Sequence, residues 1–203
     1  YAAGDLDYAT GFGATLAVDH GSRVLCPAYR LAPEHPFPAA LEDALTAYKY
    51  LLEKGYEAST ITLCGESAGG GLCYSLCLKL RELGLPLPGS IIAISPWVDL
   101  TQSGESYETN REKDPSMRVE MLDFFAKCYA QDPADPLVSP LLGDLSGMPP
   151  SLIFAGGDEI MCSDAQRLGE KLTENGVQTS LIVKPERWHA YVLYCLDEDA
   201  EAF

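Results

Sequence analysis

A serine between small residues is the first feature of this sequence that can do chemistry. Gly65, Ser67 and Gly69 fit the pattern G-x-S-x-G within Gly-Glu-Ser-Ala-Gly-Gly. An apolar β-type run comes directly before this segment and a helical pattern directly after it, which is typical of a sharp strand-to-helix turn that exposes a nucleophilic serine. The turn should bring neighbouring backbones together, so small residues are expected two places before and after Ser67. A glycine-rich turn with a solvated serine is the alternative.

A serine hydroxyl becomes a good nucleophile only when a base removes its proton, and the chain has three histidines that could do so. His20 ends a helical pattern, where a cation suits the helix dipole, and His35 lies in a proline-rich loop. His189 follows the last expected strand in Arg-Trp-His-Ala-Tyr. That position suits a catalytic base at the carboxyl ends of the strands, so His189 is the predicted base. A half-buried packing histidine is the alternative.

The base in turn needs a carboxylate to orient it, and three acidic residues lie near the end of one expected strand. Asp158 stands at the strand tip after two glycines, Glu159 follows it, and Asp164 falls in the first turn of a helix. The helix dipole explains Asp164. Successive side chains along a strand alternate in direction, so Glu159 should point away from the side that Asp158 faces. We therefore expect Asp158 to be the acid. The chain order Ser67, Asp158, His189 differs from that of trypsin-like and subtilisin-like enzymes.

Alternating strand and helix patterns must position these residues. The expected strands are continuous apolar runs, which indicates a mostly parallel sheet with both faces covered by helices. They are Arg23–Ala28, Thr60–Cys64, Ser90–Ser95, Ser151–Ala155 and Thr179–Lys184.

Four helical patterns lie among these strands. The first ends at Gly21, the second opens with Pro38, and the third, Leu72 to Leu80, is apolar on more than one side and therefore central. Ser163 with Gln166 resembles a capping box for the fourth, which should stop at Gly176.

One stretch of about 50 residues, at about 100–150, interrupts this alternation. It is polar at first and then carries a single helical pattern between turn-rich flanks. Long insertions in compact domains tend to be functional, so a helical cap or lid over the site is expected here. The domain prediction is one α/β domain over residues 1–203 with this insertion.

The composition limits the kinds of partner that the protein is expected to bind. The chain of 203 residues has a formal net charge of −16, which should repel nucleic acid and anionic membrane surfaces, and its sequence has no apolar run long enough to span a membrane. Its seven cysteines are odd in number and lie in apolar segments, which favours reduced thiols in a cytoplasmic protein. Cys73 and Cys77 share a helix face but lack a second ligand pair, so no metal is expected.

Together, six segments resemble the hormone-sensitive-lipase-like branch of the α/β-hydrolases, whose members are mostly bacterial carboxylesterases. The resemblance covers essentially the whole chain and implies the α/β-hydrolase fold, Ser67 as nucleophile, His189 as general base and acid, Asp158 as orienting acid, and the Ala68 backbone N–H as an oxyanion-hole donor. The reaction that it implies needs neither a metal nor an organic cofactor. The segments are Tyr29–Ala44, Gly65–Leu72, Ser95–Leu100, Asp135–Leu141, Gly156–Ile160 and Trp188–Tyr191.

One family feature is absent. Members of this branch carry a His-Gly-Gly-Gly loop that supplies further oxyanion-hole donors, and Tyr1–Asp5 looks like the residues that directly follow it. We therefore expect the 203 residues to correspond to the carboxy-terminal two-thirds of an esterase, without the family's first strands and amino-terminal cap helices.

The predicted function is serine-dependent hydrolysis of small, short-chain carboxylic esters through an acyl-enzyme. The expected partner is a small-molecule ester, and a homodimer is left open. An amidase with the same triad is one alternative. Another is a non-catalytic small-molecule-binding member of the fold, against which the presence of His189 argues.

Overall fold

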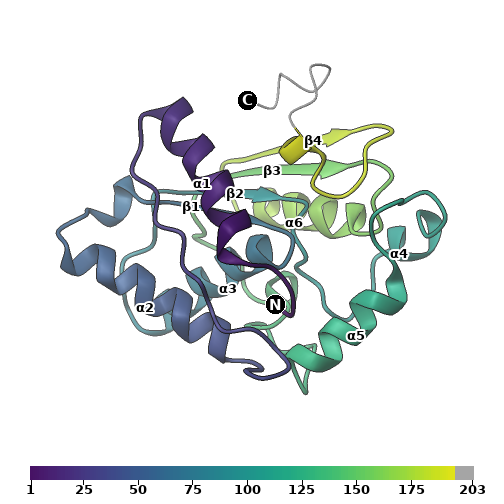
Figure 1. Cartoon of the computed structure of the whole chain (residues 1–203), viewed down its shortest axis with the longest axis horizontal. Helices are drawn as coiled ribbons and strands as arrows, with labels where there is room; N and C mark the ends of the chain where they lie inside the picture. Colours follow the sequence, from purple (N-terminus) through teal and green to yellow (C-terminus); the bar gives the residue numbers. More distant parts are fainter. Residues whose placement is uncertain (195–203) are drawn as a thin grey trace.

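A four-stranded parallel sheet forms the centre of the molecule (Figure 1). The computed structural model describes residues 1–194. The strands are β1 (Thr62–Glu66), β2 (Ser90–Ile94), β3 (Ser151–Gly156) and β4 (Thr179–Lys184), in the order β1-β2-β3-β4. All three neighbouring pairs are parallel. Four of the five predicted strands are thereby confirmed, and their carboxyl ends meet at one edge of the sheet.

The fifth predicted strand, Arg23–Ala28, does not form in the described part of the chain. These residues carry no strand assignment, β1 pairs only with β2 within residues 1–194, and Val24 and Leu25 are exposed. An apolar run indicates a tendency to be extended and buried, but a strand also needs a neighbour to complete its ladder of hydrogen bonds. The sequence pattern gives no information about that neighbour.

Two helices, α3 (Ala68–Glu82) and α6 (Cys162–Glu174), pack on the same face of the sheet. Side chains of α3 such as Tyr74 and Cys77 join Ala93 of β2, Ile153 of β3 and Leu168 of α6 in one buried cluster. Ten residues of α3 are buried, which confirms that this helix is central. Its position matters for function because α3 starts immediately after Ser67.

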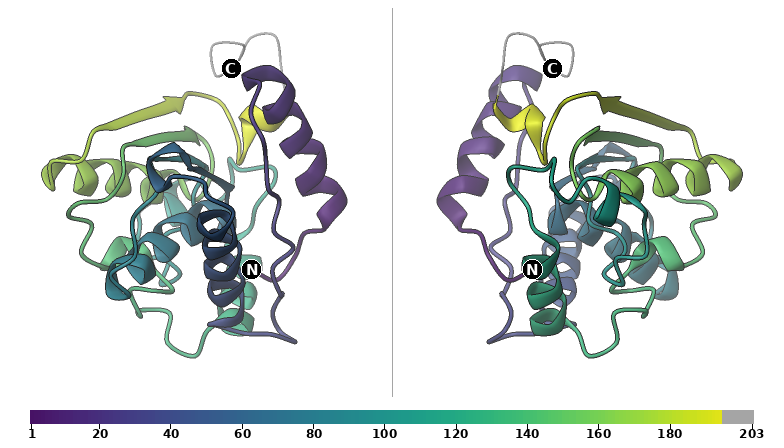
Figure 2. Two further views of the ribbon diagram at one scale, coloured as in Figure 1. Left: turned by 90° about the vertical axis from the view of Figure 1, so that its left-hand side faces the viewer. Right: turned by 90° about the vertical axis from the view of Figure 1, so that its right-hand side faces the viewer.

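Two further helices flank this centre. α1 (Leu6–His20) places Phe12 against the opposite face of the sheet, and the side views show it on the other side of the sheet from α6 (Figure 2). As expected, α1 ends before Gly21, whose φ of 60° is left-handed. α2 (Ala39–Glu53) packs on α3, and its N-cap is Pro38.

The predicted capping box of the fourth helix is wrong. α6 begins at Cys162 with Met161 as its N-cap, so Ser163 lies inside the helix. Its hydroxyl instead lies 2.6 Å from the hydroxyl of Ser106 in a buried pair. The side chain therefore has a tertiary partner and does not cap its own helix.

Residues 100–150 contain α4 (Ser106–Thr109), α5 (Val119–Tyr129) and the 3-10 turn η2 (Pro140–Leu142). α5 is the single helical pattern expected there, with Leu122, Ala126 and Tyr129 buried. The ring of Tyr129 stacks on Tyr1 with a centroid distance of 3.8 Å. Two more 3-10 turns, η1 (Ala58–Thr60) and η3 (Tyr191–Tyr194), complete the elements.

The described cysteines are free thiols, as expected from their number and setting. Burial raises the pKa of Cys73 well above its ordinary value and that of Cys77 to about 12, so these thiols stay protonated. Cys195 lies outside the described residues. Within residues 1–194, the helices are all too short or too polar to cross a bilayer.

Candidate active site

Ser67 occupies the sharp turn between β1 and α3, with φ 54° and ψ −118°. A non-glycine residue in this region is strained and needs its surroundings to hold it. The backbone N–H of Ser67 donates to the carbonyl of Ile94 at 2.9 Å, and its carbonyl accepts from the N–H groups of Gly71 and Trp97. The turn is thus tied to the end of β2 and to the loop that follows β2.

The glycines around this turn differ in how closely other atoms approach them. A Cβ atom on Gly65 would lie 2.3 Å from the carbonyl oxygen of Gly69, which confirms the expected close approach of backbones before the serine. A Cβ atom on Gly69 would meet nothing within 4 Å, so the expectation of crowding at that position is wrong. The close approach occurs instead at Gly70 and Gly71, where α3 passes the loop after β2.

His189 and Glu159 form a buried pair at the same edge of the sheet. The Nδ1 atom of His189 lies 2.9 Å from Oε2 of Glu159. Side-chain exposure is 7% for His189 and 0% for Glu159. Glu159 comes from the turn after β3, and His189 from the loop after β4. A carboxylate at Nδ1 holds the ring so that Nε2 can accept a proton.

The structure corrects the prediction that Asp158 orients the histidine. β3 ends at Gly156, so the alternation of side-chain directions that favoured Asp158 no longer applies at residues 158 and 159. Asp158 is half-buried, and its backbone N–H donates to the carbonyl of Arg187. The carboxylate that reaches His189 belongs to Glu159.

The pair is electrostatically coupled. Burial alone would lower the pKa of His189, but the hydrogen bond and negative charge of Glu159 outweigh burial, and the pKa lies above its ordinary value. Burial raises the pKa of Glu159, and its hydrogen bond to His189 opposes that rise. The net effect is a histidine that binds a proton more readily than a free imidazole.

The end of β2 connects Ser67 to His189. Ile94 accepts the Ser67 N–H, and the next residue, Ser95, accepts the backbone N–H of Ala190 through its hydroxyl at 2.9 Å. Ser95 is buried and has a positive φ of 46°. Sequence reasoning missed Ser95, and the only available signal was its place at the tip of an apolar strand.

A second carboxylate faces the other nitrogen of the imidazole. Oε1 of Glu66 lies 3.9 Å from Nε2 of His189, and Oε2 of Glu66 accepts a hydrogen bond from the hydroxyl of Tyr8 at 2.9 Å. The charge of Glu66 contributes to the raised pKa of His189. The glutamate was visible in the sequence as the residue before Ser67, but its role depends on the loop that brings His189 beside it.

The other candidates lie elsewhere. His20 and His35 are exposed, and Asp164 is buried in a different network, where its carboxylate accepts from the backbone of Val98 and Asp99. Burial is the main reason why the pKa of Asp164 is raised to about 8. The sequence suggested that the dipole of α6 explains the presence of Asp164. In the structure, its buried hydrogen bonds to the backbone of Val98 and Asp99 explain it instead.

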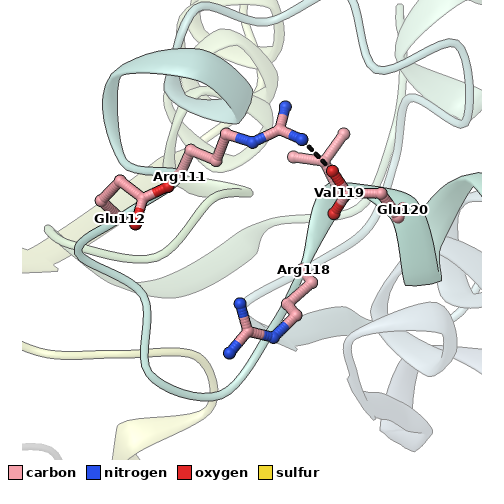
Figure 3. A pocket seen from close by; sticks show the side chains of 5 residues that line it. All are labelled: Arg111, Glu112, Arg118, Val119 and Glu120. Atoms are coloured by element: carbon pink, nitrogen blue, oxygen red, sulfur yellow. Dashed lines mark hydrogen bonds and ion pairs between the residues drawn. The ribbon is translucent and has the colours of Figure 1, made fainter.

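A hollow of about 220 Å³ lies where the chain enters α5 (Figure 3). Four of its five lining side chains are charged, and Arg111 forms an ion pair with Glu120 across it. None of the lining residues belongs to the serine turn or to the buried pair. They are Arg111, Glu112, Arg118, Val119 and Glu120.

A family model and several relatives match this chain. The model of the alpha/beta hydrolase fold matches residues 1–193. An acetyl-hydrolase of Streptomyces hygroscopicus is 40% identical over 176 residues, which cover 86% of this chain and 59% of that protein. An esterase of Acinetobacter venetianus is 35% identical and is covered over 56% of its length. The chain thus spans less than two-thirds of these curated relatives.

Solved structures agree with the sequence matches. An esterase of the bacterial hormone-sensitive lipase family is 42% identical with a TM-score of 0.83, covering 86% of this chain and 60% of that one. An esterase/lipase from an uncultured bacterium is 35% identical with a TM-score of 0.94, covering all of this chain and 69% of that one. The chain belongs to the alpha/beta hydrolase fold family, in the hormone-sensitive-lipase-like branch that its motifs predict.

Proposed function

We propose that this protein is a serine-dependent carboxylic ester hydrolase in which Ser67 is the nucleophile, His189 the general base and acid, and Glu159 the orienting acid. The observation that carries the proposal is the buried contact of 2.9 Å between His189 and Glu159, at the sheet edge where Ser67 occupies a strained turn. A buried carboxylate on Nδ1 directs Nε2 toward proton transfer, and a serine in such a turn presents its hydroxyl to substrate.

Each step uses one of these groups. His189 takes the proton from the Ser67 hydroxyl while the serine oxygen attacks the ester carbonyl, and the negative charge of Glu159 stabilises the resulting imidazolium. The imidazolium then protonates the departing alcohol, which leaves an acyl group on Ser67. Water, deprotonated by the same histidine, attacks that acyl group, and the imidazolium returns the proton to the oxygen of Ser67 as the bond to the acyl group breaks and the acid is released.

The developing oxyanion needs donors at the start of α3. Ala68 is the first residue of this helix, where backbone N–H groups have no acceptor within the helix and the helix dipole favours negative charge. In the proposed reaction the Ala68 N–H donates to the oxyanion. One oxyanion-hole donor typically contributes a factor of about 10² to 10³ in kcat.

We propose short acyl groups as substrates. Supporting this choice, one relative is named an acetyl-hydrolase, and a structural neighbour with 35% identity, EstE5, was soaked with p-nitrophenyl butyrate. The predicted order of kcat/KM is acetate and butyrate above octanoate and laurate in a series of p-nitrophenyl esters. A maximum at laurate would contradict it.

Residues 100–150 are proposed to be a cap beside the site. Asn110 from this stretch donates hydrogen bonds to the carbonyls of Gly157 and Glu159, so the insertion is bonded directly to the turn that carries the proposed acid. We treat the stretch as part of one domain because it packs on α6 and on the core that contains Tyr1.

The proposal is tested by hydrolysis of p-nitrophenyl butyrate with the full chain and the variants Ser67→Ala and His189→Ala. Loss of turnover in both, with circular dichroism unchanged, supports the assignment. The corresponding p-nitroanilide measured in parallel distinguishes an esterase from an amidase. Activity retained by Ser67→Ala would refute the serine mechanism.

A further inference from the structure

Three polar side chains of the segment around α4 lie one helical turn apart and face the turn after β3. Ser106, Asn110 and Asp114 follow each other at intervals of four residues. Backbone hydrogen bonds join them in sequence, because the N–H of Asn110 donates to the carbonyl of Ser106 and that of Asp114 to the carbonyl of Asn110, each at 3.0 Å. The spacing therefore places all three on one side of the coil.

Each of these side chains bonds to the backbone around Glu159. The hydroxyl of Ser106 donates to the carbonyl of Ile160 at 2.7 Å. The amide of Asn110 donates to the carbonyls of Gly157 and Glu159, both at 3.0 Å. Oδ2 of Asp114 accepts the backbone N–H of Ile160 at 3.0 Å.

The peptide group between Glu159 and Ile160 is thus held at both of its polar atoms. Asn110 bonds to its oxygen and Asp114 to its N–H. The local backbone bonds at this residue are longer, at 3.4 Å from the Glu159 N–H to the carbonyl of Gly156 and 3.2 Å from the Cys162 N–H to the carbonyl of Glu159. Asn110 and Asp114 are themselves buried, with exposures of 6% and 8%, so water competes little for these bonds.

We propose that Asn110 and Asp114 are positioning residues for the reaction, which fix the backbone of Glu159 so that its carboxylate stays against His189. The inference rests on the proposed function and extends it to a segment outside the triad. Misplacement of a reacting group by about 1 Å can cost as much as about 10² in rate, so bonds that hold the Glu159 backbone from outside its own turn are expected to matter for turnover.

Asp114 also contributes charge to the site. The charged groups that face His189 are Glu159, Glu66 and Asp114, and those that face Glu159 are His189 and Asp114. The charge of Asp114 therefore favours the protonated forms of both partners. Its other oxygen accepts from the backbone N–H groups of Ser116 and Met117 and from the hydroxyl of Ser116, so the carboxylate is held in place.

The test uses two variants and one matched control in the full chain. Asn110→Ala removes both donors, and Asp114→Asn keeps the size of the side chain while removing its charge. Glu112→Gln changes an exposed carboxylate of the same segment. With p-nitrophenyl butyrate, we expect kcat to fall about 10- to 100-fold in Asn110→Ala with KM nearly unchanged, and to stay as in the wild type in Glu112→Gln.

A double-mutant cycle separates positioning from general destabilisation. If Asn110 acts through Glu159, then Asn110→Ala should cost little in a chain that already carries Glu159→Gln, because the carboxylate it positions is gone. Equal losses in the two backgrounds would overturn the proposal. In Asp114→Asn, the acidic limb of kcat/KM should move to lower pH, and an unmoved limb would also count against it.

Failure of this inference can be distinguished from failure of the proposed function. Covalent labelling of Ser67 by an alkyl fluorophosphonate reports on the nucleophile alone. A wild-type chain that is labelled, with Asn110→Ala turning over at the wild-type rate, overturns only the positioning role. A wild-type chain that hydrolyses the ester without labelling of Ser67 overturns the proposed function, and the positioning role with it.

Discussion

Glu159→Gln is the substitution that most clearly separates the structure from the sequence pattern. The change keeps the size of the side chain but removes the negative charge that lies 2.9 Å from Nδ1 of His189 in a fully buried position. Glutamine can also donate from its amide nitrogen, and that contact would favour the wrong tautomer of the imidazole. Asp158→Asn is the matched control. The carboxylate of Asp158 is adjacent in sequence to that of Glu159, but the carboxylates that contact His189 belong to Glu159 and Glu66.

The expected loss follows from what the pair does. Replacing the orienting acid of a serine triad typically lowers kcat by about 10⁴, with the geometry otherwise intact. We expect a loss of about 10³ to 10⁴ for Glu159→Gln, which corresponds to about 4 to 5.5 kcal/mol in the activation free energy. Asp158→Asn should stay within about tenfold of the wild type, because its hydrogen bond to Arg187 is made by its backbone N–H.

The assay is kcat for p-nitrophenyl butyrate near pH 8, with thermal unfolding to check the fold. A second readout comes from pH. The wild-type kcat/KM should fall on acidification through a pKa above the ordinary histidine value of about 6.5, because Glu159 raises the pKa of His189. In Glu159→Gln this limb should move to lower pH. A variant that keeps a tenth of the activity, or an equal loss in Asp158→Asn, would refute the reasoning.

Three further predictions concern Glu66, Asp164 and the glycines at the start of α3. Glu66→Gln removes a charge that raises the pKa of His189, so the acidic limb of kcat/KM should shift to lower pH, and an unmoved limb would argue against the contact. Burial raises the pKa of Asp164 to about 8, so between about pH 4 and pH 8 the folded protein keeps a proton that the unfolded chain has lost. The stabilisation by the protonated form is complete below about pH 4 and is lost as the pH rises to about 8. The free energy of unfolding, measured with denaturant, should therefore fall less between about pH 4 and pH 8 in Asp164→Asn than in the wild type. Gly71→Ala should destabilise the fold by roughly 1 to 3 kcal/mol, because its Cβ would lie 2.2 Å from a backbone oxygen. Gly69→Ala should be neutral or slightly stabilising, because its Cβ would meet nothing within 4 Å. Equal effects of the two substitutions in a denaturant titration would contradict this prediction.

Local patterns predicted the elements that lie in the core. The four strands of the sheet and α3 are confirmed because continuous apolar runs and a helix apolar on several sides report burial directly. The serine turn was found because its strand, glycines and helix are adjacent in the sequence. The unpaired Arg23–Ala28 segment was not anticipated, since pairing depends on a neighbour distant along the chain.

The choice of acid failed for a related reason. Asp158 and Glu159 are adjacent, and the decision between them depends on the path of a turn after the strand has ended. That path is fixed by Asn110 and Asp114, which lie more than 40 residues earlier in the sequence. No pattern within the turn carries this information. The capping assignment of Ser163 failed in the same way, because its partner Ser106 comes from the same distant segment.

Covalent labelling tests the central claim most directly. An alkyl fluorophosphonate should react with one residue of an active preparation, and peptide mass spectrometry should locate the adduct on Ser67, with hydrolysis of p-nitrophenyl butyrate lost in proportion to labelling. Ser67→Ala should be neither labelled nor active. An active chain whose adduct lies on another residue, or which is inhibited without an adduct on Ser67, would contradict the account.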